Sequence, residues 1–148
     1  MNKVFFSSLS NEWETPDYIF NELNKEFNFT LDPCSNDYNY KVIKHYTLKE
    51  NGLVQSWKNE VVFCNPPYNR EISKWVKKSV FESKYNNALV VMLIPSRTDT
   101  SYFHDYILPY SCEIRYIRGR LKFMLNGVIQ NSAPFPSMIV IFNRGGSL

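Results

Sequence analysis

The sequence predicts one α/β domain over residues 1–148, built on a mostly parallel sheet with an antiparallel edge. Three apolar segments, at residues 29–35, 61–64 and 88–94, are each stopped by a proline and followed by polar residues. A segment with helical periodicity lies between the last two, as expected for parallel strands joined by a crossover helix. A hairpin pattern follows near the C-terminal end and supplies the antiparallel strands.

Composition fits this size and leaves a surplus of aromatic residues. The chain has 148 residues, of which 44% are hydrophobic, and this suffices for one sizeable core. Its formal charge of +3 permits a nucleic-acid partner without requiring one. The 11 Phe, 10 Tyr and 3 Trp exceed what such a core needs. We therefore expect some of them on a working surface, where base stacking is a natural use.

The cysteines indicate a cytoplasmic protein. Cys34, Cys64 and Cys112 are odd in number and widely spaced, with no metal-ligand spacing, so we expect reduced thiols and no metal. No signal peptide is recognisable, and no apolar run approaches the roughly 18 residues of a membrane span.

The first helix is expected after the sequence Trp13-Glu14-Thr15-Pro16, with Thr15 as the N-cap and Pro16 as the first helical residue. The apolar face of this helix has helical spacing and comprises Ile19, Phe20, Leu23 and Phe27. Two interpretations of Trp13 and Thr15 remain open: packing and capping, or a loop that closes over a cofactor.

The next segment, residues 29–35, places Asp32 at the carboxyl end of a predicted strand, where it is well placed to face a ligand. Ser35, Asn36 and Asp37 follow, and such small polar residues tolerate a left-handed backbone. Residues 38–57 are predicted to be rich in loops. Because Asp32 and Asn65 are only 33 positions apart, we expect an abbreviated fold.

The central motif is Asn65-Pro66-Pro67-Tyr68, at the end of the strand at residues 61–64. The prolines hold the loop rigid beyond the sheet edge. The side-chain oxygen of Asn65 and the carbonyl of Pro66 are suited to accept hydrogen bonds from an exocyclic amine, which localises its lone pair. Tyr68 is suited to stack on a base. The alternative is a rigid turn with no chemistry.

A helix is expected at residues 70–85, with a buried stripe formed by Ile72, Trp75, Val76, Val80 and Phe81. The strand at 88–94 ends at Pro95, and the polar residues 96–99 follow it. Polar residues thus follow three strands, at Asp32, at Asn65 and at residues 96–99, which predicts one composite site.

The remaining elements are a short helix at residues 101–108, a strand at 113–117, a hairpin turning at Asn126-Gly127 and a last strand at 138–142. We interpret His104 as a packed or solvated residue. The basic residues around the hairpin fit ordinary surface charge and phosphate contact equally well. They are Arg115, Arg118, Arg120 and Lys122.

Taken in order, these motifs resemble the small phage DNA (adenine-N6)-methyltransferases of the Dam type, from about Glu12 to Asn143. The shared motifs include Trp13-Glu14-Thr15-Pro16, Leu31-Asp32-Pro33-Cys34, Asn65-Pro66-Pro67-Tyr68, Arg97-Thr98-Asp99-Thr100 with Phe103-His104, Gly119-Arg120-Leu121-Lys122-Phe123 and Ala133-Pro134-Phe135-Pro136-Ser137. The central tetrapeptide is common to many amino-methyltransferases, whereas the ordered set is specific.

The resemblance implies a Rossmann-like methyltransferase fold, S-adenosylmethionine as cofactor and adenine in double-stranded DNA as acceptor. The implied catalytic residues are Asn65, Pro66, Pro67 and Tyr68. The implied cofactor residues are Trp13, Thr15, Pro16, Asp32, Pro33 and Asn65. The implied DNA contacts are Arg97, Arg118, Arg120 and Lys122. The glycine-rich turn usual after the Asp32 position is absent here.

Two alternatives of other classes stay open: a protein glutamine methyltransferase, and a degenerate fold kept as a DNA-binding or host-interacting module. The sequence predicts no membrane partner, and it leaves the oligomeric state and the DNA target sequence open.

Overall fold

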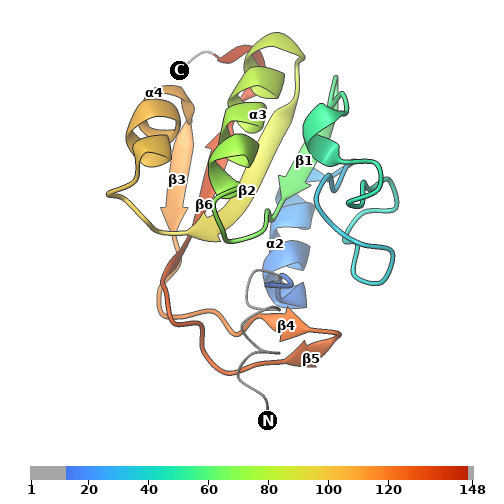
Figure 1. Ribbon diagram of the computed structural model, residues 1–148, viewed down its shortest axis with the longest axis vertical. Coiled ribbons are helices and arrows are strands. Elements are labelled where there is room, and N and C mark those ends of the chain that lie inside the picture. The colour runs from blue at the N-terminus through green and yellow to red at the C-terminus, as the bar shows by residue number, and fades with distance from the viewer. Residues whose placement is uncertain (1–12, 147–148) are drawn as a thin grey trace.

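The computed structural model describes residues 13–146 (Figure 1). The ends of the predicted domain, residues 1–12 and 147–148, lie outside the described residues, and so does Glu12 of the first motif.

The core is a four-stranded mixed sheet in the order β1 (Val61–Cys64), β2 (Leu89–Pro95), β6 (Ser137–Phe142) and β3 (Glu113–Tyr116). β1 and β2 are parallel, and β6 is antiparallel to both of its neighbours. The strand β3 therefore runs in the same direction as β1 and β2. The expected antiparallel pairing is present, but the reversed strand β6 lies inside the sheet and the edge is β3. The cause is burial: all six residues of β6 are buried, whereas β3 has exposed ends.

Beyond β1 the sheet continues as single bridges. Leu31 pairs in parallel with Val62, and Asp32 pairs in parallel with His45. The strand expected at residues 29–35 is therefore reduced to a short extended contact. Asp32 lies in this extended segment beside β1, the strand that Asn65 follows.

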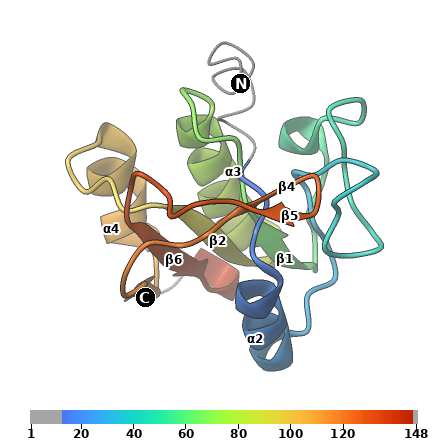
Figure 2. The same ribbon diagram turned by 90° about the horizontal axis from the view of Figure 1, so that it is seen from below.

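Helices cover both faces of the sheet (Figure 2). One face packs against α3 (Ile72–Tyr85), the π-helical turn η2 (Phe103–Ile107) and its continuation α4 (Leu108–Tyr110). The other packs against α2 (Asp17–Phe27) and residues on either side of the hairpin. Because strand side chains alternate between faces, neighbouring residues enter different cores. The α3 core takes Val62, Cys64, Val90, Met92, Ile94, Met138, Val140 and Phe142, and the α2 core takes Phe63, Val91, Leu93, Ile139 and Ile141.

The helix α2 confirms the predicted face but not the predicted start. Phe20 and Leu23 are buried. The helix begins at Asp17, and Pro16 is the N-cap, with an extended ψ of 137° and its carbonyl accepting from Ile19 N and Phe20 N. Thr15 was predicted to be the cap and is not. Its hydroxyl is engaged by Asn65, 50 positions away.

The helix α3 confirms the buried stripe except at one end. Ile72, Trp75, Val76 and Val80 are buried, but Phe81 is 52% exposed and packs beside Tyr85. The buried position near this end goes instead to Glu82, whose carboxylate accepts hydrogen bonds from Trp57 N and Asn86 Nδ2. A buried carboxylate is tolerated when its oxygens are paired in this way.

The hairpin consists of β4 (Met124–Leu125) and β5 (Val128–Ile129). Its turn residues Asn126 and Gly127 have φ values of 52° and 79°, the pair of positive values that a type I′ turn requires. The hairpin lies beyond the carboxyl end of β1 (Figure 1). Two 3₁₀ turns, η1 (Gly52–Val54) and η3 (Arg144–Gly146), complete the described fold.

Candidate active site

A pocket of about 330 Å³ opens at the carboxyl end of β1. Four groups of residues line it: the segment before α2, the turn after Asp32, the loop that leads to η1 and the start of the Asn65 loop. They include Trp13, Glu14, Thr15, Asp32, Pro33, Asn36, Tyr38, Leu48, Asn51, Asn65, Pro66 and Pro67. Its volume lies within the range of small-molecule sites.

The side chain of Asn65 is held in this pocket by two hydrogen bonds from its amide nitrogen. Nδ2 donates to the carbonyl oxygen of Trp13 and to Thr15 Oγ1, the latter at 3.0 Å. A carbonyl oxygen only accepts, so the nitrogen must face Trp13, and this settles the orientation of the amide. Oδ1 is then left buried, with no hydrogen-bond partner among the described residues. Five buried side-chain oxygens of the described residues have no such partner, and of these only Ser35 Oγ and Asn65 Oδ1 belong to residues that line the pocket. An amide oxygen can only accept, so Asn65 Oδ1 is suited to a donor from a ligand.

Asp32 is a buried carboxylate, only 3% exposed. Oδ2 accepts from Lys41 N at 2.9 Å and Oδ1 accepts from Cys34 N at 3.4 Å. Burial raises the pKa of Asp32 to about 7, an effect that these two hydrogen bonds and the nearby His45 oppose only in part. The ammonium of Lys41 points elsewhere, to Asp17 of α2 at 2.9 Å. The carboxylate is therefore held in place and suited to a cationic ligand group.

The turn after Asp32 is held by an asparagine side chain and not by a left-handed backbone. Asn36 Oδ1 accepts from Tyr38 N at 2.8 Å and from Asn39 N at 2.9 Å. None of Ser35, Asn36 and Asp37 has a positive φ, so the tolerance of these small polar residues for a left-handed backbone is not used here. Side-chain oxygens that cap backbone N–H groups replace it.

Gly52 closes the wall of the pocket on the other side. A Cβ at this position would lie 2.1 Å from the carbonyl oxygen of Pro33, and the Gly52 carbonyl accepts from Trp57 Nε1 at 3.0 Å. Two pocket-lining segments thus meet backbone to backbone, which only glycine allows. This role was not predicted from the sequence, where residues 38–57 were expected only to be rich in loops. Its only signal was the Asn-Gly pair before an apolar residue.

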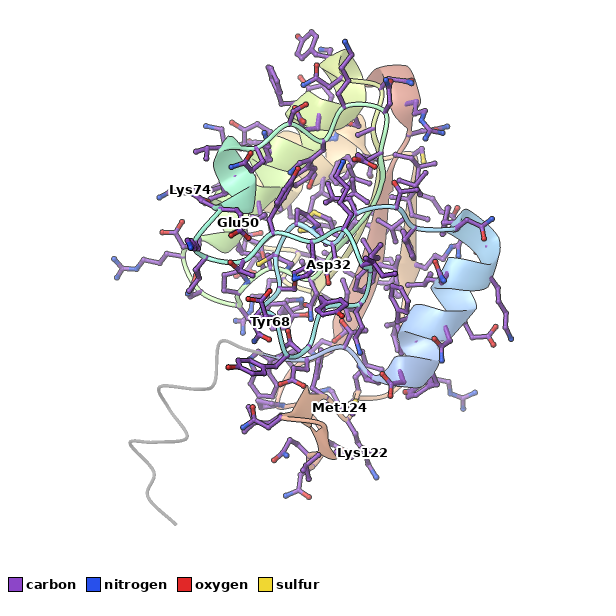
Figure 3. All side chains as sticks on the ribbon, turned by 90° about the vertical axis from the view of Figure 1, so that its right-hand side faces the viewer. Asp32, Glu50, Tyr68, Lys74, Lys122 and Met124 are labelled. Carbon is purple, nitrogen blue, oxygen red and sulfur yellow. The ribbon has the colours of Figure 1, made fainter. Side chains whose placement is uncertain are left out.

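Tyr68 is held against the other aromatic residues near the pocket. Its ring meets Phe123 and Phe135 at centroid distances of 5.9 and 5.5 Å, both nearly perpendicular, and its hydroxyl donates to the Leu93 carbonyl at 3.0 Å. Figure 3 shows Tyr68 and Asp32 between the loop that carries Glu50 and the hairpin strand that carries Met124. Burial raises the pKa of the Tyr68 phenol well above its usual value, so the hydroxyl stays neutral.

The basic residues predicted to contact DNA do not line the pocket. Arg97, Arg118, Arg120 and Lys122 are all exposed. Arg115 differs from them: it makes a two-pronged ion pair with Glu26, at 2.7 Å for both contacts, and a further one with Glu113. Its charge is therefore already neutralised, and of the two interpretations of the hairpin charges it fits only the structural one.

The structure brings together most of the predicted site residues but not all. Trp13, Thr15, Asp32, Pro33, Asn65, Pro66 and Pro67 line one pocket. Pro16 does not line it and serves as the N-cap of α2, and Tyr68 lies beside it. Residues 96–99 are also absent from its lining. His104 is exposed, which agrees with a solvated residue, and its Nε2 contacts the Thr98 carbonyl at 2.8 Å.

Two further features of the described residues bear on the class of site. No helix within residues 13–146 is long and apolar enough to cross a membrane. In the same residues, no group of three or more His, Cys, Asp or Glu side chains is placed to hold a metal ion.

Comparison with known proteins assigns the chain to a family. Residues 5–145 match the family described as DNA N-6-adenine-methyltransferase (Dam). A protein of Haemophilus phage HP1 (strain HP1c1), named DNA N-6-adenine-methyltransferase, is 32% identical over 135 residues, which cover 88% of this chain and 77% of that protein. A protein of Escherichia phage T1 with the same name is 32% identical over 95 residues, covering 63% of this chain and 39% of that protein.

Proposed function

The chain belongs to the DNA N-6-adenine-methyltransferase (Dam) family, and from this premise we propose that it methylates the exocyclic amine of adenine in double-stranded DNA with S-adenosylmethionine. The observation that carries the proposal is the Oδ1 atom of Asn65 at the start of the proline loop, which is buried and has no hydrogen-bond partner within residues 13–146. The amine of adenine is the donor that completes it.

Asn65 and Pro66 would act together on this amine. The amine has two N–H bonds, and the Asn65 oxygen and the Pro66 carbonyl are the two acceptors that the motif offers. Accepting both hydrogen bonds draws the nitrogen lone pair out of conjugation with the ring and directs it toward the methyl donor. The amine proton leaves after the N–C bond has formed, so the site needs acceptor geometry and not a base with a tuned pKa.

The residues of the pocket suit S-adenosylmethionine. S-adenosylmethionine supplies an electrophilic methyl group on a sulfonium centre. Its α-ammonium is a cation that the buried Asp32 carboxylate, which has no side-chain ion pair of its own in the described residues, is suited to hold. Trp13, Thr15 and Pro33 line the same pocket. Pro16 contributes by starting α2 directly behind Thr15.

The DNA would approach from the side of the hairpin. Arg97, Arg118, Arg120 and Lys122 are exposed and offer contacts to phosphates. The adenine must leave the duplex to reach Asn65, and Tyr68, which directly follows the two prolines, offers an aromatic ring for it to stack on. The fixed φ of Pro67 restricts the loop between Asn65 and Tyr68.

The sheet is consistent with an abbreviated Rossmann-like methyltransferase fold. Asp32 and Asn65 follow neighbouring parallel segments, joined in residues 33–60 by loops and the single turn η1. We propose that residues 1–148 form one such domain. We also propose that the protein acts in the cytoplasm of the bacterial host, because the two relatives are phage proteins.

Transfer of labelled methyl groups tests the proposal. The purified chain is incubated with methyl-labelled S-adenosylmethionine and either double-stranded DNA or a mixture of host proteins, and the product nucleosides are separated. We expect label in N6-methyladenine. Label in the side-chain amide of a protein glutamine would show instead that the protein is a glutamine methyltransferase. If the protein binds the cofactor but transfers no methyl group to either substrate, the alternative of a degenerate DNA-binding module is favoured.

A further inference from the structure

Glu14 joins the hairpin to the segment before α2 through both its backbone and its side chain. Its N–H donates to the Met124 carbonyl at 3.1 Å, and its own carbonyl accepts from Met124 N at 2.9 Å. Its carboxylate accepts from Asn126 N at 2.7 Å and reaches Gly127 N at 3.4 Å. These last two N–H groups belong to the hairpin turn itself, so a single side chain caps the turn.

The two neighbours of Glu14 hold Asn65. The Trp13 carbonyl and the Thr15 hydroxyl accept the hydrogen bonds of Asn65 Nδ2. The backbone carbonyl of Trp13 and the side chain of Thr15 thus hold Asn65, while the carboxylate of Glu14, which also lines the pocket, holds the hairpin turn. Three consecutive residues therefore connect the hairpin turn to the amide of Asn65.

A second connection runs through the rings. Trp13 packs edge-on against Phe123 and Phe135, at centroid distances of 5.5 and 5.1 Å. Tyr68 packs against the same two rings. Phe123 precedes Met124, so the pairing of Glu14 with Met124 also sets Trp13 beside Phe123. Figure 3 shows Tyr68 close to the hairpin strand that carries Met124.

We propose that Glu14 is a positioning residue: by clamping the β4–β5 turn onto residues 13–15, it holds Asn65 and Tyr68 in the arrangement that accepts the adenine. This inference rests on the proposed function. Through Glu14, the hairpin that follows Arg120 and Lys122 is connected to Asn65, the proposed acceptor of the adenine amine. Glu14 lines the pocket, but its carboxylate is taken up by the hairpin turn, so we assign it a positioning role and no contact with the base or the cofactor.

Three variants test the clamp. Glu14→Ala removes both acceptors of the carboxylate. Glu14→Asp keeps the charge but shortens the reach. Glu14→Gln keeps one oxygen that can accept from Asn126 N. Glu22→Ala is the matched control, since Glu22 is exposed on α2 and its only hydrogen-bond partner in the described residues is Lys25.

The measurements are single-turnover methylation of DNA at saturating S-adenosylmethionine, S-adenosylhomocysteine binding by calorimetry, and amide hydrogen exchange at Asn126 and Gly127. We expect Glu14→Ala and Glu14→Asp to slow methyl transfer by about tenfold or more, the worth of one charged hydrogen bond. Glu14→Gln and Glu22→Ala should stay within about threefold of the wild type. Affinity for S-adenosylhomocysteine should hold throughout, and exchange at the two amides should accelerate in the slow variants.

Two results overturn the proposal. One is methyl transfer in Glu14→Ala and Glu14→Asp equal to that of the control. The other is a loss of S-adenosylhomocysteine affinity that saturating cofactor compensates, which would make Glu14 a cofactor ligand. The exchange measurement needs no catalysis: unchanged exchange at Asn126 and Gly127 in the Ala variant refutes the clamp, even if the wild type methylates no DNA and the proposed function fails. Should Glu14→Ala not fold, Glu14→Asp carries the same comparison.

Discussion

The buried carboxyl group of Asp32 predicts that cofactor binding weakens as the pH falls below about 7. Burial raises the pKa of Asp32 to about 7 in the free protein. Below this pH the carboxyl is protonated and neutral, so it offers no charge to the ammonium of the cofactor. Above it the carboxylate is ionised, and the affinity should reach a plateau.

The size of the effect follows from the fraction ionised. Each pH unit below the pKa reduces the ionised fraction about tenfold, equivalent to about 1.4 kcal/mol of binding free energy per unit. The stability of the free protein should change in the opposite direction. An acid whose folded pKa is raised binds its proton more tightly when folded, so stability falls as the pH rises from about 4 to about 7. Bound cofactor should restore part of that loss.

Calorimetric titration with S-adenosylhomocysteine between pH 5.5 and 8.5, a range of about 1.5 units on either side of the Asp32 pKa, measures this dependence. We expect the wild type to lose affinity below pH 7 and Asp32→Asn to bind weakly with a flat profile. His45 also titrates nearby, with a pKa raised by its hydrogen bond to Asp37, so His45→Gln is the control and should keep the wild-type slope. A flat wild-type profile, or the same slope in Asp32→Asn, would refute the assignment of Asp32 to the ammonium.

Two further predictions concern the walls of the site. Tyr68→Ala should weaken capture of the adenine by about 1–3 kcal/mol, the worth of one base–aromatic stack. Tyr68→Phe should keep methylation but lose about 1 kcal/mol of stability in urea unfolding, because the Leu93 carbonyl loses its donor; inactivity of the Phe variant would give the hydroxyl a chemical role. Gly52→Ala should cost about 1–3 kcal/mol of stability and weaken S-adenosylhomocysteine binding, because its Cβ would collide with the Pro33 carbonyl. If Gly52→Ala unfolds at the wild-type temperature and binds S-adenosylhomocysteine with wild-type affinity, the close contact between Gly52 and Pro33 is not required.

Elements whose structure depends on neighbouring residues in the chain were predicted correctly from the sequence. The apolar run of β2, the type I′ turn at Asn126-Gly127 and the end of β1 at the proline loop all follow from residue spacing and backbone preference. The resemblance located the pocket residues Asp32 and Asn65 before any geometry was known. These features depend on neighbours in the chain, which a sequence displays directly.

Features that depend on residues far apart in the chain were not predicted correctly from the sequence. Thr15 has the residue type of an N-cap, but Asn65 takes its hydroxyl, and no local pattern shows a bond across 50 positions. Glu82 has the type of a solvated residue, but it is buried because Trp57 N and Asn86 donate to it, and Phe81 is correspondingly exposed. The place of β6 inside the sheet is likewise set by tertiary packing, since its five apolar residues, Met138 to Phe142, suit any central position.

The most direct test of the account is the rate of methyl transfer by Asn65→Ala. The change removes the Oδ1 acceptor and leaves the Trp13 carbonyl and the Thr15 hydroxyl without the donor that they share. Losing one preorganised hydrogen bond to the reacting group should slow single-turnover methylation of DNA by about 100- to 1,000-fold. S-adenosylhomocysteine affinity should stay close to that of the wild type, since Asp32 remains. His104→Ala serves as the control and should react at the wild-type rate. A near-normal rate in Asn65→Ala, with His104→Ala inactive, would contradict the assignment of the amine acceptor.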